Sequence, residues 1–521
     1  MHYNALLAKI QSLTFCKKPA FILFLILCAF FFKGVFLTSL FPIFAGQDET
    51  KHFNSVTFLA EPRPITWHIK SNVKKDAEGM QKGNYTEEIL ETSKAVNFDE
   101  EIKGELYNTL SFNDGFYGKN EAEINENKWK QYNENYPVNR ADISLYHKLA
   151  AKITKTFSSQ DLLFRYFLVR IFSVFLGTLT VLFSYLIAKN VGFSSKASLL
   201  TAAIVAFQPR FSIYTAAINY DILLILLFTS FTLGSILALK NGLNWKNFSL
   251  MAVSVYLGIQ TKPTASVLLV VFASLMAYFA YRKIGIEKRK TKLLFISAII
   301  LVITALGAYF KKYIPATFLD LGTTIPSIGK YLSDSITPGK LGLSARTYWG
   351  TLTWVDSWSL DNITNFISKI ESFAILGIIL FLLPSKYHNK IISAIRRLYL
   401  HLKTKCTKKN SGQTKETAIS DMGKWHNFLP EKKYVLFFIL MIIALQLGIR
   451  FADWRAHGEL GTPGRYFLPN IAAHIILVFT GIGALLRKEK YFEKSLIIGL
   501  ILMMAFMLYI IFDVIIYRYY L

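Results

Sequence analysis

Two acidic residues and a histidine follow the first long apolar stretch of the sequence, in the segment FPIFAGQDETKHFN. If the chain turns helical there, Asp48 and His52 are four residues apart and share one face of the helix. Adjacent carboxylates beside a bilayer are costly unless they are solvated or used, and one of them suits a general base. Asp48, Glu49 and His52 are therefore candidate catalytic residues.

A structural role is also compatible with this pattern, because acidic residues at the beginning of a helix interact favourably with its dipole. Spacing alone leaves catalysis and capping open, and it does not show whether Asp48 or Glu49 is the base. A zinc peptidase is a poor fit, since its helix signature requires His-Glu-x-x-His and Asp48 stands at the first position.

Positive residues stand at the ends of several other apolar stretches, which face the exterior if the N-terminus is cytoplasmic. Lysine and arginine are disfavoured at external ends. As a group they predict a site for an anionic ligand, such as a lipid phosphate, although any single one also fits a side chain that snorkels to the headgroups. The cations are Arg165, Arg170, Arg210, Lys262 and Arg465.

A further carboxylate begins the apolar stretch of INYDILLILL. Asp221, with Asn219 two residues before it, caps this helix or holds a substrate hydroxyl or a cation, and both interpretations remain open. A divalent metal on Asp48, Glu49, His52 and Asp221 is possible but is not required, and the sequence predicts no metal site.

These residues must be positioned by membrane helices, because 53% of the 521 residues are apolar, 18% are charged and the mean hydropathy is +0.35. Apolar stretches of about 20 residues predict an all-α polytopic membrane protein with about 11 transmembrane helices. Whether the break at Thr261–Pro263 separates two spans stays open. The expected spans are 20–41, 163–188, 197–214, 220–239, 247–261, 264–281, 292–310, 368–384, 434–450, 466–486 and 495–517.

The net charge of +25 is explained by orientation. With a cytoplasmic N-terminus, about half of the 59 basic residues fall in inner connectors, as the positive-inside rule requires. No nucleic-acid partner is therefore expected. Residues 20–41 contain Lys33 and lack a good cleavage site, which favours a retained anchor over a signal peptide.

The expected organisation alternates membrane helices with loops, and the external and cytoplasmic loops differ in charge. The long loop after the first span is predicted to be external and to contain amphipathic helices, and the loop with twelve Lys/Arg and three acids is predicted to be cytoplasmic. The regions are a cytoplasmic N-terminus 1–19, helix 20–41, external loop 42–162, helices 163–310, external loop 311–367, helix 368–384, cytoplasmic loop 385–433 and helices 434–521.

Four motifs in this order resemble the GT-C superfamily of multi-spanning glycosyltransferases. More narrowly, they resemble an uncharacterised family of predicted bacterial membrane proteins with Asp-Glu-x-x-His after the first span. The other motifs are QPRFSIYTAAINYD, GIQTKPTA and GTPGRYFLP. One departure is NRADISLYHKLAAKI, where the family has a proline-rich, tyrosine-containing segment.

The resemblance implies inverting transfer of a sugar from a polyprenyl-phosphate carrier to a glycan, lipid or protein acceptor on the external face. Asp48 or Glu49 would deprotonate the acceptor hydroxyl. The leaving lipid phosphate would be stabilised by cations such as Arg210, Lys262 and Arg465. Tyr466 joins the expected substrate-binding residues through the Gly-Arg-Tyr motif.

Two other functions remain as alternatives. A transporter or flippase of lipid-linked glycans would use the same cations without the acidic pair, but the internal repeats common in transporters are not visible. A membrane scaffold whose external loop binds a partner would leave the external cations unexplained.

Overall fold

The computed structural model describes residues 19–60, 89, 92, 143–284, 344–345, 347–350, 358–383, 428–457, 462–516 and 520. All regular structure in these ranges is helical, which confirms the predicted all-α class. The helices are α2 (Pro19–Leu40), α3 (Glu49–Ala60), α6 (Leu145–Thr156), α7 (Leu162–Asn190), α8 (Ser195–Phe207), α9 (Pro209–Thr215), α10 (Asp221–Asn241), α11 (Trp245–Thr261), α12 (Ser266–Ile284), α17 (Trp358–Leu382), α19 (Lys432–His457), α20 (Ile471–Leu486) and α21 (Glu489–Tyr509), with short turns η6 (Pro263–Ala265), η8 (Gly464–Asn470) and η9 (Ile510–Ile516).

Within those ranges, eight helical segments are long and apolar enough to cross a bilayer by length and composition. Three of the eleven expected spans are not among them. The stretch 247–261 forms α11, which has 17 residues and is shorter than a typical span. The stretch 292–310 lies outside the described residues.

The third missing span, 197–214, is broken into α8 and α9. Pro209 lacks the N–H that a continuous helix needs, and it takes the first position of α9 instead. The side chain of Gln208 then caps α9 by accepting the N–H of Phe211 at 2.5 Å. The break turns Arg210 into a residue of a short helix at the end of the bundle.

A second break separates α11 from α12. Lys262 follows α11 in an extended conformation (φ −154°, ψ 135°), and Pro263 begins the turn η6 that leads into α12. The two apolar stretches around Thr261–Pro263 are therefore separate helices, and the lysine stands at the junction between them.

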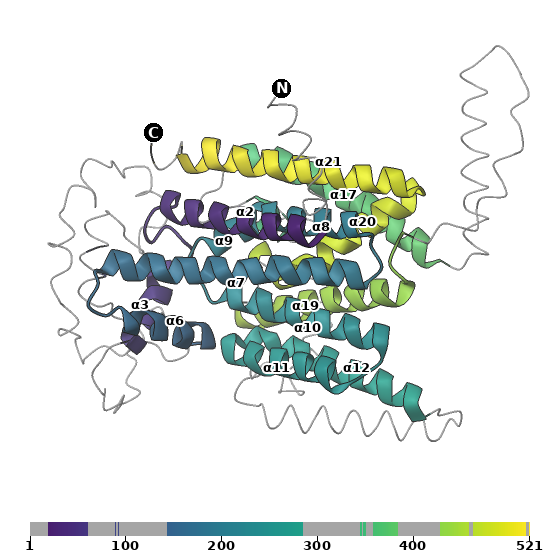
Figure 1. Ribbon diagram of the computed structural model, residues 1–521, viewed down its shortest axis with the longest axis horizontal. Helices are drawn as coiled ribbons and strands as arrows, with labels where there is room; N and C mark the ends of the chain where they lie inside the picture. The colour runs from purple at the N-terminus through teal and green to yellow at the C-terminus, as the bar shows by residue number, and fades with distance from the viewer. Residues whose placement is uncertain are drawn as a thin grey trace, which may run out of the picture.

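The long helices run side by side, with α21 and α2 toward one edge of the view and α11 and α12 at the other (Figure 1). Helix α10 is apolar on all sides and almost completely buried, and it packs on α7, α11 and η8. The amphipathic α6, expected from SLYHKLAAKITKTF, packs on α3 at one end of the bundle (Figure 1).

Lys33 connects α2 to the break between α8 and α9. The ammonium of this partly buried residue donates to the carbonyl of Ala206, in the last turn of α8, and to Ser212 Oγ at 2.7 Å. The last carbonyls of a helix have no partner within the helix, and a positive charge there is favourable. Lys33 therefore stabilises the end of α8.

Replacing this lysine is expected to destabilise the protein. Lys33→Met removes the donor to Ala206, and we expect the free energy of unfolding to fall by about 1–3 kcal/mol. Thermal unfolding of the detergent-solubilised protein measures the loss. Lys240→Met is the matched control, because Lys240 bonds Asn190 on the surface. Equal melting temperatures for the two variants would contradict the role of Lys33.

Candidate active site

The segment between α2 and α3 makes a sharp turn before the acidic pair. Phe44 and Asp48 both have left-handed backbone conformations, with φ of 64° and 55°. Asp48 directly precedes α3, and its carbonyl accepts the N–H of His52 at 3.0 Å. This turn sends the two adjacent carboxylates into different surroundings.

Glu49 is completely buried and its carboxylate is surrounded by donors. Arg170 binds it with two parallel hydrogen bonds of 2.8 Å, from Nε and from Nη2. The main-chain N–H groups of Gly46 and Ile218 each donate to it at 2.9 Å. Four donors occupy both oxygens, so the structure gives Glu49 the role of an anchor between α3, α7 and the segment before α10.

Arg170 was expected to bind phosphate, and in the structure its guanidinium donates to protein groups. Its guanidinium donates to Glu49 and also to the carbonyls of Thr38, Phe41 and Pro42, which engages all five N–H groups. No N–H is left for a ligand. Three of these hydrogen bonds go to carbonyl groups at the end of α2, because buried helix-end carbonyls need donors.

Arg165 is also buried, and its Nε donates to the carbonyl of Gln160 at 3.0 Å. This contact lies in the turn that leads into α7. Arg165 was expected to bind a phosphate. The contact that the structure shows is a local one, with the main chain at the beginning of α7.

Gln47, which the sequence analysis did not select, joins three separate segments. Its Oε1 accepts from the hydroxyl of Tyr214 at 3.1 Å and from Arg210 Nη2 at 3.4 Å, and its carbonyl is 3.4 Å from Asn219 Nδ2. The loop that contains Asp48 is therefore held against α9 and against the segment that leads into α10.

Two arginines have buried guanidinium nitrogens without a partner in the described structure. These are Nε and Nη1 of Arg210 and Nη1 of Arg465. Arg210 lies over the ring of Tyr214 at 4.9 Å, and burial, together with the positive charge of Arg465, lowers its pKa. Buried donors without acceptors are costly, so this arrangement favours an anion between the two arginines.

Arg465 also connects these donors to the first acidic residue. Its Nη2 donates to the hydroxyl of Tyr466 at 3.0 Å and lies 3.9 Å from Asp48 Oδ2. The side chain of Asp48 is 33% exposed. Unlike Glu49, Asp48 is accessible, and its carboxylate lies beside the guanidinium of Arg465.

Lys262 forms a second centre of charge. Its ammonium is 2.7 Å from Asp221 Oδ1 and lies over the rings of Tyr220 (4.7 Å) and Tyr466 (4.6 Å). Asp221 makes no capping bond to α10; instead Asn219 Oδ1 accepts the N–H of Asp221 at 2.7 Å. Asp221 therefore pairs with Lys262, and Asn219 orders the helix start.

A pair of histidines completes the site. His52 Nδ1 lies 3.0 Å from His147 Nε2, and the two rings stack at 5.2 Å. His147 belongs to α6, in the segment that lacks the family's prolines, and sequence reasoning missed it. Its position three residues after Ser144, where it completes a capping box, is the signal that was present.

Acid is expected to destabilise the protein through this pair. Burial, followed by the charges of Lys262, Arg465 and Lys51, lowers the pKa of His52 to about 3, from 6.5. Below about pH 6.5 the unfolded chain therefore binds a proton that the folded protein does not, so this contribution to stability is lost as the pH falls toward 3.

Melting temperatures of the solubilised protein between pH 7.5 and 4.5 test this expectation. His52→Asn should lose less stability over the interval than the wild type. Parallel curves for the two proteins would show that His52 does not contribute to the acid sensitivity.

Eight of the eleven predicted site residues lie in one connected set of contacts, and four further residues take part in it; their roles toward a substrate stay predictions. Glu49, Arg165 and Arg170 are drawn into structural contacts. No group of three or more potential metal ligands of the His, Cys, Asp and Glu types occurs within the described ranges. The eight are Asp48, His52, Arg210, Asn219, Asp221, Lys262, Arg465 and Tyr466, and the additions are Gln47, His147, Tyr214 and Tyr220.

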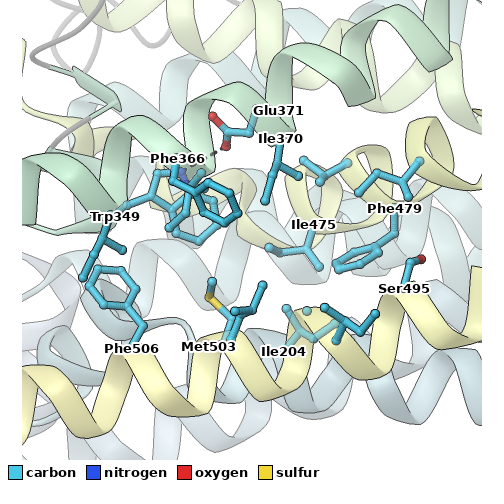
Figure 2. A pocket seen from close by; sticks show the side chains of 17 residues that line it. Ile204, Trp349, Phe366, Ile370, Glu371, Ile475, Phe479, Ser495, Met503 and Phe506 are labelled. Atoms are coloured by element: carbon cyan, nitrogen blue, oxygen red, sulfur yellow. Dashed lines mark hydrogen bonds between the residues drawn. The ribbon is translucent and has the colours of Figure 1, made fainter.

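An apolar cavity lies among α8, α17, α20 and α21 (Figure 2). It has a volume of about 240 Å³, and its wall is formed almost entirely by apolar side chains such as Ile475 and Phe506. Trp349 lines it and donates to Glu371 at 3.0 Å. The preceding residue, Tyr348, accepts at its carbonyl from Gln208, the residue that caps α9. The cavity is thus linked to the short helix of Arg210.

An all-helical, multi-pass membrane protein with a charged site at the end of its bundle is the class that these observations define. The family model described as dolichyl-phosphate-mannose-protein mannosyltransferase matches residues 149–317, about a third of the chain. That family belongs to the GT-C superfamily, so the match supports a GT-C membrane glycosyltransferase. Comparisons with curated proteins and with solved structures gave no match. The matched range contains Arg210, Asp221 and Lys262, whereas Asp48 and Arg465 lie outside it.

Proposed function

We propose that this protein transfers a sugar from a polyprenyl-phosphate carrier to an acceptor hydroxyl on the external face of the membrane, with inversion at the anomeric carbon. The observation that supports this most directly is that Arg210 and Arg465 each have buried guanidinium nitrogens without a partner in the described structure, and that Arg465 also lies 3.9 Å from an accessible carboxylate, Asp48. The matched family adds a candidate sugar, since its description names mannose and a protein acceptor.

Each part of the site has a role in this reaction. Asp48 takes the proton of the acceptor hydroxyl while the acceptor oxygen forms a bond to the anomeric carbon. The bond from that carbon to the phosphate oxygen breaks, and the carrier phosphate leaves with the electron pair. Arg210 and Arg465 donate to the phosphate as its charge grows, so no separate general acid is needed.

The isoprenoid part of the donor needs an apolar surface near the phosphate. We propose that the cavity lined by Trp349 and Phe506 accepts part of this chain, because Tyr348 and Gln208 connect its wall to the helix of Arg210. A hydrocarbon chain fits a cavity with an almost wholly apolar wall better than a polar ligand does.

Removing the arginine charge tests the phosphate site. Arg210→Gln should lower kcat/KM for sugar transfer about 100-fold, as when one donor of a charge-stabilising site is lost. The assay follows radiolabelled mannose from polyprenyl-phosphate-mannose into products, using protein in membranes that contain the native acceptors. The control, Arg282→Gln, changes an exposed arginine of α12 beside Tyr278.

Two results would overturn the proposal. One is unchanged transfer by Arg210→Gln and Arg465→Gln. The other is movement of the lipid-linked sugar across proteoliposomes without any transfer to an acceptor, which would favour the flippase. A donor with a short isoprenoid chain should react more slowly than the full-length donor if the cavity takes part.

A further inference from the structure

The hydrogen bonds of the histidine pair determine which ring nitrogens carry a hydrogen. The main-chain N–H of Ser144 donates to His147 Nδ1 at 3.0 Å. A main-chain N–H can only donate, so Nδ1 of His147 is the unprotonated nitrogen of that ring. A neutral His147 must then carry its hydrogen on Nε2.

The tautomer of His147 determines the tautomer of His52. Nε2 of His147 is 3.0 Å from Nδ1 of His52, so it donates there and makes that nitrogen an acceptor. A neutral His52 in turn carries its hydrogen on Nε2. The chain from Ser144 through His147 to His52 therefore selects a single tautomer of the residue in the site.

The His52 ring lies beside the charged groups of the site. Its edge meets the ring of Tyr220 at 4.6 Å, and the Lys262 ammonium lies over the same tyrosine ring at 4.7 Å. His52 is also one helical turn from Asp48, whose carbonyl accepts its N–H. Protonating the buried pair would add a positive charge beside Lys262, Arg465 and Lys51, which favours two neutral rings.

From this arrangement we propose that His147 is a positioning residue that holds His52 as a neutral Nε2–H donor for the sugar–phosphate substrate. The role of His52 toward the substrate rests on the proposed glycosyl transfer, whereas the assignment of its tautomer does not. His52 then acts as a hydrogen-bond donor to an oxygen of the donor substrate, leaving proton removal to Asp48. The same proton order opposes a metal between the rings, because a metal would need the nitrogen of His147 that carries the hydrogen.

Substitutions at His147 separate positioning from packing. Glutamine places an amide N–H near the position of Nε2 and can still donate to His52, whereas asparagine reaches only the position of Nδ1. We expect His147→Gln to keep at least a third of the wild-type kcat. His147→Asn and His147→Leu should lose about 10-fold or more in kcat with less than a 3-fold change in KM for the donor. Equal kcat values for the three variants, or losses that follow their melting temperatures, would overturn the proposal.

A spectroscopic experiment tests the tautomer without any assay of activity. Protein with ¹⁵N-labelled histidine rings gives ring-nitrogen signals, and those of His52 are identified by their loss in His52→Asn. We expect a protonated Nε2 and an unprotonated Nδ1 in the wild type, and a mixture of tautomers in His147→Leu. A proton on Nδ1, or a shift of both rings on adding Zn²⁺ or Mn²⁺, would overturn the inference. If the tautomer is as expected but no sugar transfer occurs, the proposed function fails, and the inference that His147 selects the tautomer of His52 stands.

Discussion

Asp48→Asn is expected to lower kcat for sugar transfer at least 100-fold while the protein folds normally. Loss of a general base costs roughly 10²–10⁴-fold in rate, and asparagine keeps the shape of the side chain. The fold should tolerate the change because Asp48 is a third exposed and its nearest cations, Lys51 and Arg465, are both 3.9 Å away. Transfer from polyprenyl-phosphate-mannose and thermal unfolding measure the two effects.

Glu493→Gln is the matched control for Asp48→Asn. Glu493 pairs with Lys196 at 2.8 Å, and the lysine is well exposed. Its loss should leave both turnover and melting temperature close to the wild type. Turnover by Asp48→Asn within 3-fold of the wild type would remove Asp48 as the base.

Glu49→Gln, one residue further along, is expected to fail in folding. It would leave the buried Arg170 charge without its partner, and breaking a buried ion pair in this way costs about 3–5 kcal/mol. We expect little monodisperse protein in size-exclusion chromatography of detergent extracts, and the same result for Arg170→Met. The Glu49→Met/Arg170→Met double variant should recover part of the loss, because it removes both charges together.

A different outcome would reassign the base. If Glu49→Gln folds as well as the wild type but loses turnover, the buried carboxylate takes part in the chemistry. The two adjacent acids thus have different expected phenotypes, one in catalysis and one in folding, and measuring turnover and folding for both variants distinguishes them.

The sequence was sufficient for the architecture because lipid imposes a strong length and composition requirement on each helix. Eight expected spans have counterparts among the described helices. Where the prediction for 197–214 was wrong, the residue responsible was visible: Pro209 lies inside an apolar run, and its missing N–H breaks the helix.

The roles of individual charges could not be predicted from residue type. Arg170 and Arg210 look alike in the sequence. Glu49 and three carbonyls at the end of α2 together engage every N–H of Arg170, whereas Arg210 has two unpartnered nitrogens. Likewise, Asp48 and Glu49 differ because of the left-handed turn at Asp48. The partner of His52 is 95 residues away in a separate helix, so only the tertiary fold brings it into view.

The anchoring of Glu49 has a consequence for how this protein can diversify. Arg170 from α7, Ile218 before α10 and Gly46 in the first turn all hold it, and so determine where its neighbour Asp48 stands. A change at any one of these holding groups would displace the proposed base together with Glu49. We therefore expect α7, the segment before α10 and the turn at Gly46 to change only in concert.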